Sequence, residues 1–146
     1  MIETITFEEI LPIWRNHLWP DRTSTIESNS AMCYKDGYDM FNMNTKPTFF
    51  AYKINNEIAG VNSGHMCKDN HYRSRGLFVF EKFRGMGIGT KLLIATIEQG
   101  RKENAHMCWS YPRDTSWKTY SSAEFLLDGE FSISETGNNA YCYYYY

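Results

Sequence analysis

The stretch Phe83-Arg84-Gly85-Met86-Gly87-Ile88-Gly89-Thr90 says more about fold and ligand than any other part of this sequence. An apolar run precedes it and an amphipathic pattern follows, so we expect a strand, a glycine loop and a helix in that order. The N–H groups that open a helix are unpaired, and glycines let an anion approach them closely. Arg84 and Lys91 add positive charge. The stretch therefore predicts a phosphate-binding loop, although three glycines alone are equally typical of a tight turn.

Two other glycine loops do not fit this pattern. A nucleotide-binding Walker loop ends in Gly-Lys-Ser/Thr, whereas this chain has the order Gly89-Thr90-Lys91. A dinucleotide-binding fold needs G-x-G-x-x-G at the start of a parallel unit, and the spacing from Gly85 to Gly89 is different. Both classes are therefore disfavoured.

The remaining sequence predicts short strands and two further helices. Thr6 is typical of a helix cap, and apolar residues recur at helical spacing from Phe7 to Leu18, before Pro20. Asn55-Asn56 predicts a tight hairpin turn. The expected strands are residues 1–6, 48–54, 57–67, 72–80, 106–111, 131–134 and 140–146; the expected helices are 7–18, 88–103 and 114–127, and the last turn is at 137–139.

The segment from Asp21 to Lys46 has no clean period and mixes polar residues with methionines and tyrosines. Two interpretations stay open: an adaptable lid over a substrate, or packing over the edge of the sheet. Its acids, among them Asp36 and Asp39, either attract a cationic amine or form a solvated face.

Size and composition favour one globular domain over residues 1–146. The formal net charge of −2 gives no general reason to bind nucleic acid. The four cysteines form no CxxC pair, which indicates reduced thiols and no metal site. No apolar run is long enough to span a bilayer, and no basic, apolar leader begins the chain. We therefore expect a cytoplasmic protein without a membrane partner.

The glycine stretch and its neighbours together resemble the acetyl-CoA signature of the GNAT superfamily of N-acetyltransferases. Arg84, Gly87 and Gly89 fill the core pattern R/Q-x-x-G-x-G/A, with Leu77-Phe78-Val79 before it and Leu92-Leu93 after it. The resemblance covers essentially the whole chain. It implies an α+β fold with a mostly antiparallel mixed sheet of six or seven strands, helices on both faces, and strands four and five splayed apart.

The resemblance also implies the ligand and its contacts. Acetyl-CoA is the expected co-substrate, no metal is expected, and the acetyl group is expected to pass directly to a primary amine of a small molecule or peptide. The pyrophosphate would bind the backbone of Arg84, Gly85, Met86, Gly87, Ile88, Gly89 and Thr90, and the pantetheine arm would bind the strand at Phe78 and Val79.

This chain departs from the family pattern at the positions of the proton-transfer residues. The family's usual acid is a tyrosine in N-x-x-A-x-x-x-Y, shortly before Gly-Phe, and that position falls here at Phe125 or Leu126. Tyr120 and Tyr111 are therefore the candidate acids. No Asp or Glu lies between residues 72 and 79 to act as base, which leaves a water chain ending on Glu81, His65 or His71, or positioning alone.

Two further alternatives stay open. Without the usual acid and base, the chain could be a non-catalytic module of this fold that binds acyl-CoA or a protein partner. The run Tyr143-Tyr144-Tyr145-Tyr146 either lines the acceptor cleft or pairs with a second subunit, so a homodimer is one expected assembly.

Overall fold

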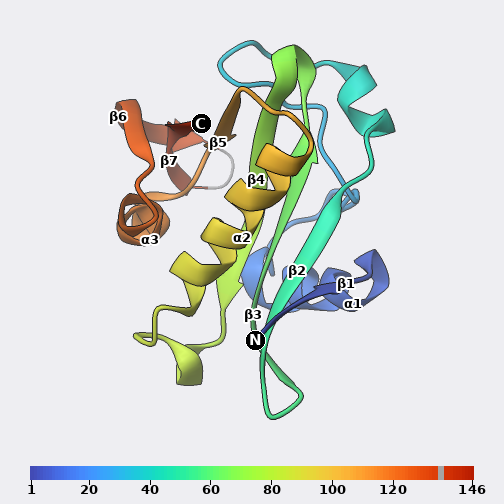
Figure 1. Ribbon diagram of the computed structural model, residues 1–146, viewed down its shortest axis with the longest axis vertical. Coiled ribbons are helices and arrows are strands. Elements are labelled where there is room, and N and C mark those ends of the chain that lie inside the picture. The colour runs from blue at the N-terminus through green and yellow to red at the C-terminus, as the bar shows by residue number, and fades with distance from the viewer. Residues whose placement is uncertain (135–136) are drawn as a thin grey trace.

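The computed structural model describes residues 1–134 and 137–146, and its centre is one seven-stranded sheet with helices on both faces (Figure 1). The strand order is β1-β2-β3-β4-β5-β7-β6, and only β4 and β5 pair in parallel. This arrangement confirms the expected α+β class and mixed sheet. The strands are β1 (Ile2–Ile5), β2 (Thr48–Ile54), β3 (Glu57–Met66), β4 (His71–Val79), β5 (Met107–Ser110), β6 (Leu126–Ser134) and β7 (Gly137–Tyr145).

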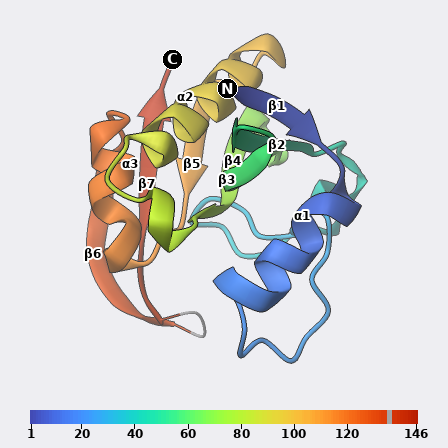
Figure 2. The same ribbon diagram turned by 90° about the horizontal axis from the view of Figure 1, so that it is seen from below.

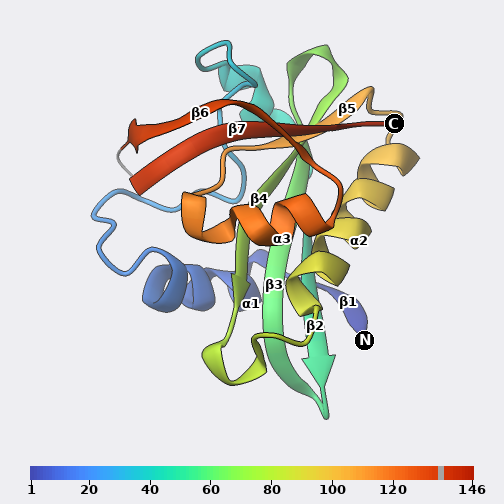
Figure 3. The same cartoon turned by 90° about the vertical axis from the view of Figure 1, so that its left-hand side faces the viewer.

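The helices divide between the two faces of the sheet, as Figures 2 and 3 show. Helix α1 (Phe7–Ile13) lies on one face and continues into a π-helical turn, Trp14–Leu18. Helices α2 (Ile88–Lys102) and α3 (Trp117–Ser122) lie on the other face. The predicted cap of α1 is confirmed, because Thr6 and Glu9 form a reciprocal capping box.

Local chemistry explains the first hairpin. Asn55 and Asn56 both adopt positive φ, 50° and 67°, which is the backbone that a two-residue hairpin turn requires and asparagine tolerates. The predicted hairpin of β2 and β3 is therefore confirmed.

The sheet opens between β4 and β5, as expected. The two strands pair only from His71 opposite Met107 to Arg73 opposite Trp109. Farther on, β4 contains one more residue than β3 between the pairs Ser63–Arg75 and Val61–Phe78, so the strand bulges there. Gly76 lies in this bulge with a φ of 82°, and its carbonyl accepts a 2.9 Å hydrogen bond from Trp14 Nε1. A Cβ on Gly76 would lie 2.4 Å from the Trp14 ring.

The prediction that the last helix extends to Leu127 is wrong. Helix α3 ends at Ser122, and Glu124 follows in a left-handed conformation with a φ of 71°. Leu126 already begins β6, and Gly129 lies inside an irregular part of that strand. The left-handed residue that follows a helix is usually glycine, whereas after α3 it is Glu124. The predicted turn at residues 137–139 is also wrong, because these residues belong to β7.

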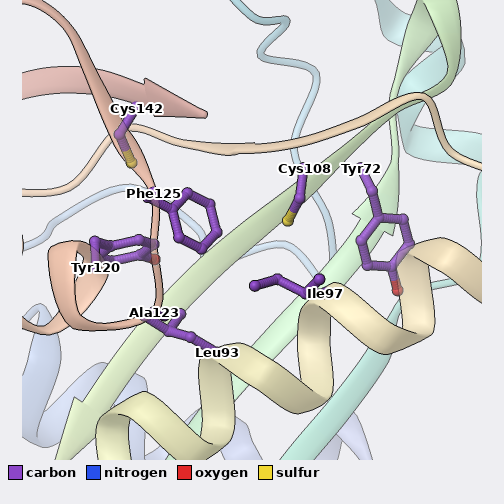
Figure 4. Close-up of a cluster of buried hydrophobic side chains, with 8 residues drawn as sticks. All are labelled: Tyr72, Leu93, Ile97, Cys108, Tyr120, Ala123, Phe125 and Cys142. Carbon is purple, nitrogen blue, oxygen red and sulfur yellow. The ribbon is translucent and has the colours of Figure 1, made fainter. Parts of the chain in front are cut away.

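Helices α2 and α3 cover a core that ends at the opening of the sheet (Figure 4). Leu93 and Ile97 on α2 pack with Tyr120 on α3 and with Phe125, all of them buried. The rings of Tyr120 and Phe125 are 5.0 Å apart. This packing holds the Tyr120 ring between the helices and the sheet.

The segment from Asp21 to Lys46 contains one short 3-10 turn, Met40–Asn44, and is fixed by two buried asparagines. Asn29 donates to the carbonyls of Asn42 and Thr45, and Asn42 donates to those of Ala31 and Met32. Two of its acids have partners within the protein: Asp36 pairs with Lys68, and Asp39 caps the backbone of Phe41. Neither of them lines the two cavities described below.

Candidate active site

The N-terminus of α2 is open to a cavity of about 580 Å³, which we call the loop cavity. No side chain caps this end of the helix, and no acid lies in its first turn. The first backbone N–H groups therefore lack intrahelical partners. Gly85 and Gly87 have φ values of 81° and 76°, and a Cβ on either would meet no atom within 4 Å. The left-handed backbone at both positions favours glycine, and the Cα atoms of Gly85 and Gly87 face open space.

Most of the residues expected to contact CoA line the loop cavity. These are Phe78, Val79, Arg84, Gly85, Gly87, Ile88, Gly89 and Thr90. Met86 does not line it, and its side chain is 56% exposed. The Nε of Arg84 donates a 2.9 Å hydrogen bond to the carbonyl of Val79, which draws the guanidinium back toward the end of β4.

The opposite wall of the loop cavity comes from α3, which the sequence did not indicate. Lys118 and Thr119 line the cavity, whereas Lys91 lies against the ring of Tyr52. A Cβ on Gly89 would be 2.8 Å from Thr119 Cγ2, so the third glycine lets α3 approach α2. The positive charge on this wall is therefore Lys118, a residue that only tertiary packing brings to the loop.

A second cavity, of about 500 Å³, adjoins the first. The two cavities share the lining residues Leu18, Leu77, Arg113 and Ser116, and so meet beside the gap between β4 and β5. We call it the arginine cavity, because Arg73, Arg75 and Arg113 line it. Tyr120 and Tyr111 line it as well.

The hydroxyl of Tyr120 lies in a buried polar network at this gap. It is 2.9 Å from Ser74 Oγ and 2.9 Å from Ser110 Oγ. Ser110 Oγ also reaches the carbonyl of Ser74 at 2.8 Å, just where the backbone ladder between β4 and β5 stops. Asn62 extends the network, donating to Ser74 Oγ and Thr96 Oγ1 at 2.9 Å each.

The network sets the protonation state of the phenol. Burial raises the pKa of Tyr120, and the hydrogen bonds from Ser110 and Ser74 oppose that rise. The phenol therefore keeps its proton at neutral pH, while both serines stabilise the phenolate that forms if the proton leaves.

The other predicted proton-transfer residues lie in different surroundings. Tyr111 stacks on Tyr141, with ring centroids 4.5 Å apart, and is half-buried. Glu81 is exposed in a 3-10 turn and lines neither cavity. His65 is fully buried, and burial, followed by the charges of Arg73 and Arg75, holds its pKa well below the usual value. His71 also lines neither cavity.

The ends of α3 correct the expected position of the tyrosine. The left-handed Glu124 and the buried Phe125 end this helix as Gly-Phe ends the family pattern. Tyr120, four positions before Glu124, then takes the place of the tyrosine. Leu126 is 59% exposed in β6 and faces no cavity.

The described residues offer neither a metal site nor a membrane-spanning helix. Within 1–134 and 137–146, no group of three or more His, Cys, Asp or Glu side chains is arranged to hold a metal ion. In the same residues, no helix is both long and apolar enough to cross a membrane.

Solved structures from three bacteria share this fold over nearly their full lengths. A ribosomal-protein-alanine N-acetyltransferase from Brucella melitensis superposes with a TM-score of 0.68 at 16% identity, covering 100% of this chain and 99% of the other. A Bacillus subtilis acetyltransferase in complex with CoA gives 0.66 at 12% identity, with 99% and 97% covered. A Bacillus anthracis acetyltransferase in complex with acetyl-CoA gives 0.66 at 14% identity, with 100% and 97% covered.

Comparison with curated proteins gives no significant match. The sequence profile of the Acetyltransferase (GNAT) family, however, matches residues 11–125, which is most of the chain. The match includes the glycine loop, both sides of the gap between β4 and β5, and Tyr120. The chain belongs to the GNAT family of acetyltransferases.

Proposed function

We propose that this protein transfers the acetyl group of acetyl-CoA directly to a primary amine. The observation that carries the proposal is the pair of adjoining cavities. The loop cavity begins at the open N-terminus of α2, and the arginine cavity contains the Tyr120 network at the gap between β4 and β5. One similar structure is a complex with CoA and another a complex with acetyl-CoA, which supports the same ligand here.

The loop cavity has the chemistry that a pyrophosphate requires. Backbone N–H groups from Gly85 to Thr90 donate to it, whereas that of Arg84 already bonds to the carbonyl of Glu81. The helix end is positive, and the side chains of Arg84 and Lys118 supply cations. The edge of β4 at Phe78 and Val79 has no strand partner on the β5 side, so it binds the pantetheine arm. Bound acetyl-CoA supplies the activated acyl thioester.

The Tyr120 network supplies the acid. As the amine nitrogen bonds to the acyl carbon and the carbon–sulfur bond breaks, Tyr120 gives its proton to the departing sulfur. Ser74 and Ser110 stabilise the phenolate through their 2.9 Å contacts. The proton of the amine leaves to water, which then restores the phenol.

The acceptor amine enters by the arginine cavity, where Tyr111 forms part of the wall. No Asp, Glu or His lies among the described residues that line this cavity. Because none of these lining side chains can take a proton from the amine, the amine must enter the cavity in its neutral form. Catalysis then rests on positioning and on Tyr120. We assign no role to Glu81, because it faces neither cavity.

The same lack of a base favours one alternative, a module of this fold that binds acyl-CoA without turnover. Calorimetry with CoA and release of free thiol from acetyl-CoA with a panel of primary amines separate the two functions. CoA binding with thiol release supports acetyl transfer. Binding without release across the panel supports the module. If CoA does not bind at millimolar concentration, and Gly87→Asp leaves the calorimetric signal unchanged, both functions are excluded.

A further inference from the structure

The arginine cavity is strongly positive at its walls. Arg73, Arg75 and Arg113 line it, and no Asp or Glu does so among the residues that the structure describes. None of the ion pairs found within residues 1–134 and 137–146 includes any of these three arginines. Within that part of the chain, no carboxylate therefore balances the charges that face the cavity.

Two of the arginines share one face of β4. Residues i and i+2 of a strand point the same way, which places Arg73 beside Arg75. The Arg75 side chain is held: it is 6% exposed, its Nη1 donates to the carbonyl of Glu27 at 2.9 Å, and its guanidinium lies 5.0 Å from the Trp14 ring. Arg73 lies 5.0 Å from the Trp109 ring, and its buried Nε has no hydrogen-bond partner.

This arrangement is electrostatically unfavourable until an anion enters. Burial, followed by the neighbouring charge of Arg73, lowers the pKa of Arg75 to about 9, and burial lowers the pKa of Arg73 as well. Arginine side chains keep their charge at neutral pH even when buried. A bound carboxylate would offset both the desolvation and the mutual repulsion, and it fits a guanidinium with two parallel hydrogen bonds.

The remaining walls indicate the size and body of the ligand. Trp19, Tyr38, Tyr111 and Tyr141 surround the cavity with aromatic rings, and a volume of about 500 Å³ suits a small molecule. Tyr120, which gives its proton to the departing sulfur in the proposed function, lines the same cavity.

We propose that the acceptor is a small amine that also carries a carboxylate, such as an amino acid with an apolar or aromatic side chain, and that Arg73 and Arg75 bind this carboxylate. The proposal rests on the proposed acetyl transfer for the identity of the amine as acceptor. The anion site itself stands on the arginines alone.

The kinetic experiment compares matched acceptors. L-phenylalanine and L-phenylalaninamide share one body, but only the first carries a carboxylate, and the amide has the less basic and so more readily neutral amine. If the protein did not bind the carboxylate, the amide would be the better acceptor, because more of its amine is neutral. We expect wild-type protein to release thiol with a kcat/KM at least tenfold higher for the acid. Arg73→Met should raise the KM for the acid about tenfold or more and leave the KM for acetyl-CoA unchanged. Arg101→Met, on the exposed side of α2, is the matched control.

The binding experiment uses non-reactive probes, so that it does not depend on turnover. Phenylacetate should raise the Tm of the wild-type protein, phenylacetamide should not, and Arg73→Met should lose the phenylacetate effect while remaining folded. Equal shifts with both probes, or an unchanged shift in Arg73→Met, would overturn the anion site. If phenylacetate binds selectively but no amine releases thiol, the anion site stands and acetyl transfer fails. If only the amide or other uncharged amines are acetylated, the assignment of the acceptor is wrong.

Discussion

Replacing Gly87 by alanine separates the ligand-binding role of the glycine loop from the strain of its backbone. Gly87 has a φ of 76°, and a Cβ there meets no protein atom within 4 Å. The substitution therefore creates no clash in the free protein. It costs only the left-handed conformation of a residue with a Cβ, roughly 1–2 kcal/mol of the free energy of unfolding.

The effect on ligand binding should be separate and larger. The new methyl group projects from a residue that lines the loop cavity, where the pyrophosphate is proposed to approach the N–H groups of α2. Losing one hydrogen bond to a charged group weakens binding by about 1.5–3 kcal/mol. We therefore expect the Kd for CoA to rise about tenfold to a hundredfold.

Gly37 offers a matched control for this experiment. Its φ is 66°, a Cβ on it also meets nothing within 4 Å, and it does not line the loop cavity. Gly37→Ala should lose a similar amount of stability in urea denaturation while its Kd for CoA, measured by calorimetry, stays at the wild-type value. If the two variants bind CoA equally well, the loop is not the pyrophosphate site and our reasoning about the open helix end is wrong.

Three further predictions concern the site and its core. Tyr120→Phe should lower kcat about a hundredfold or more at an unchanged KM for acetyl-CoA. Tyr145→Phe, at an exposed position, is the control. A larger loss of kcat in Tyr111→Phe would identify Tyr111 as the acid instead. Ser74→Ala and Ser110→Ala remove the bonds that oppose the raised pKa of Tyr120, so each should lower kcat about tenfold; lower stability at full kcat would contradict this role. Burial lowers the pKa of His65 in the folded protein. Below about pH 6.5 the unfolded chain therefore binds more protons, and the free energy of unfolding should fall from pH 7 to pH 5, by at most about 2 kcal/mol. His65→Leu should remove that part of the pH dependence in urea titrations, and an unchanged difference between the two pH values would show that His65 is not the source.

The sequence could predict the glycine loop and the elements around it because their signals are local. Thr6 with Glu9, Asn55 with Asn56, and the amphipathic pattern after Gly87 each act within a few residues. The end of α3 could not be found in this way. The left-handed residue after it is Glu124, and the buried Phe125 follows, whereas the sequence pattern favoured a helix as far as Leu127.

The surroundings of the candidate site depend on contacts between residues that are distant in the sequence. Tyr120 meets Ser74 across 46 positions of the chain, and Lys118 reaches the loop only because Gly89 lets α3 approach. No periodicity links these residues. The sequence therefore named Tyr120 as a candidate but offered no means of choosing between it and Tyr111.

The distribution of charge in the folded protein could not be predicted from the sequence either, and it bears on what the protein binds. A net charge of −2 gave no reason to expect an anionic ligand beyond the phosphates of CoA. In the folded chain the ion-paired acids, among them Asp36, Glu57 and Asp128, lie outside both cavities. Within residues 1–134 and 137–146, no acid forms an ion pair with the arginines of β4 at the opening of the sheet. A buried charge without an opposite charge is expensive, and the neighbouring Trp rings and the Glu27 carbonyl offset only part of that cost. A bound carboxylate would therefore stabilise these arginines. The local surplus of positive charge, not the overall balance, is therefore the property from which the acceptor should be sought.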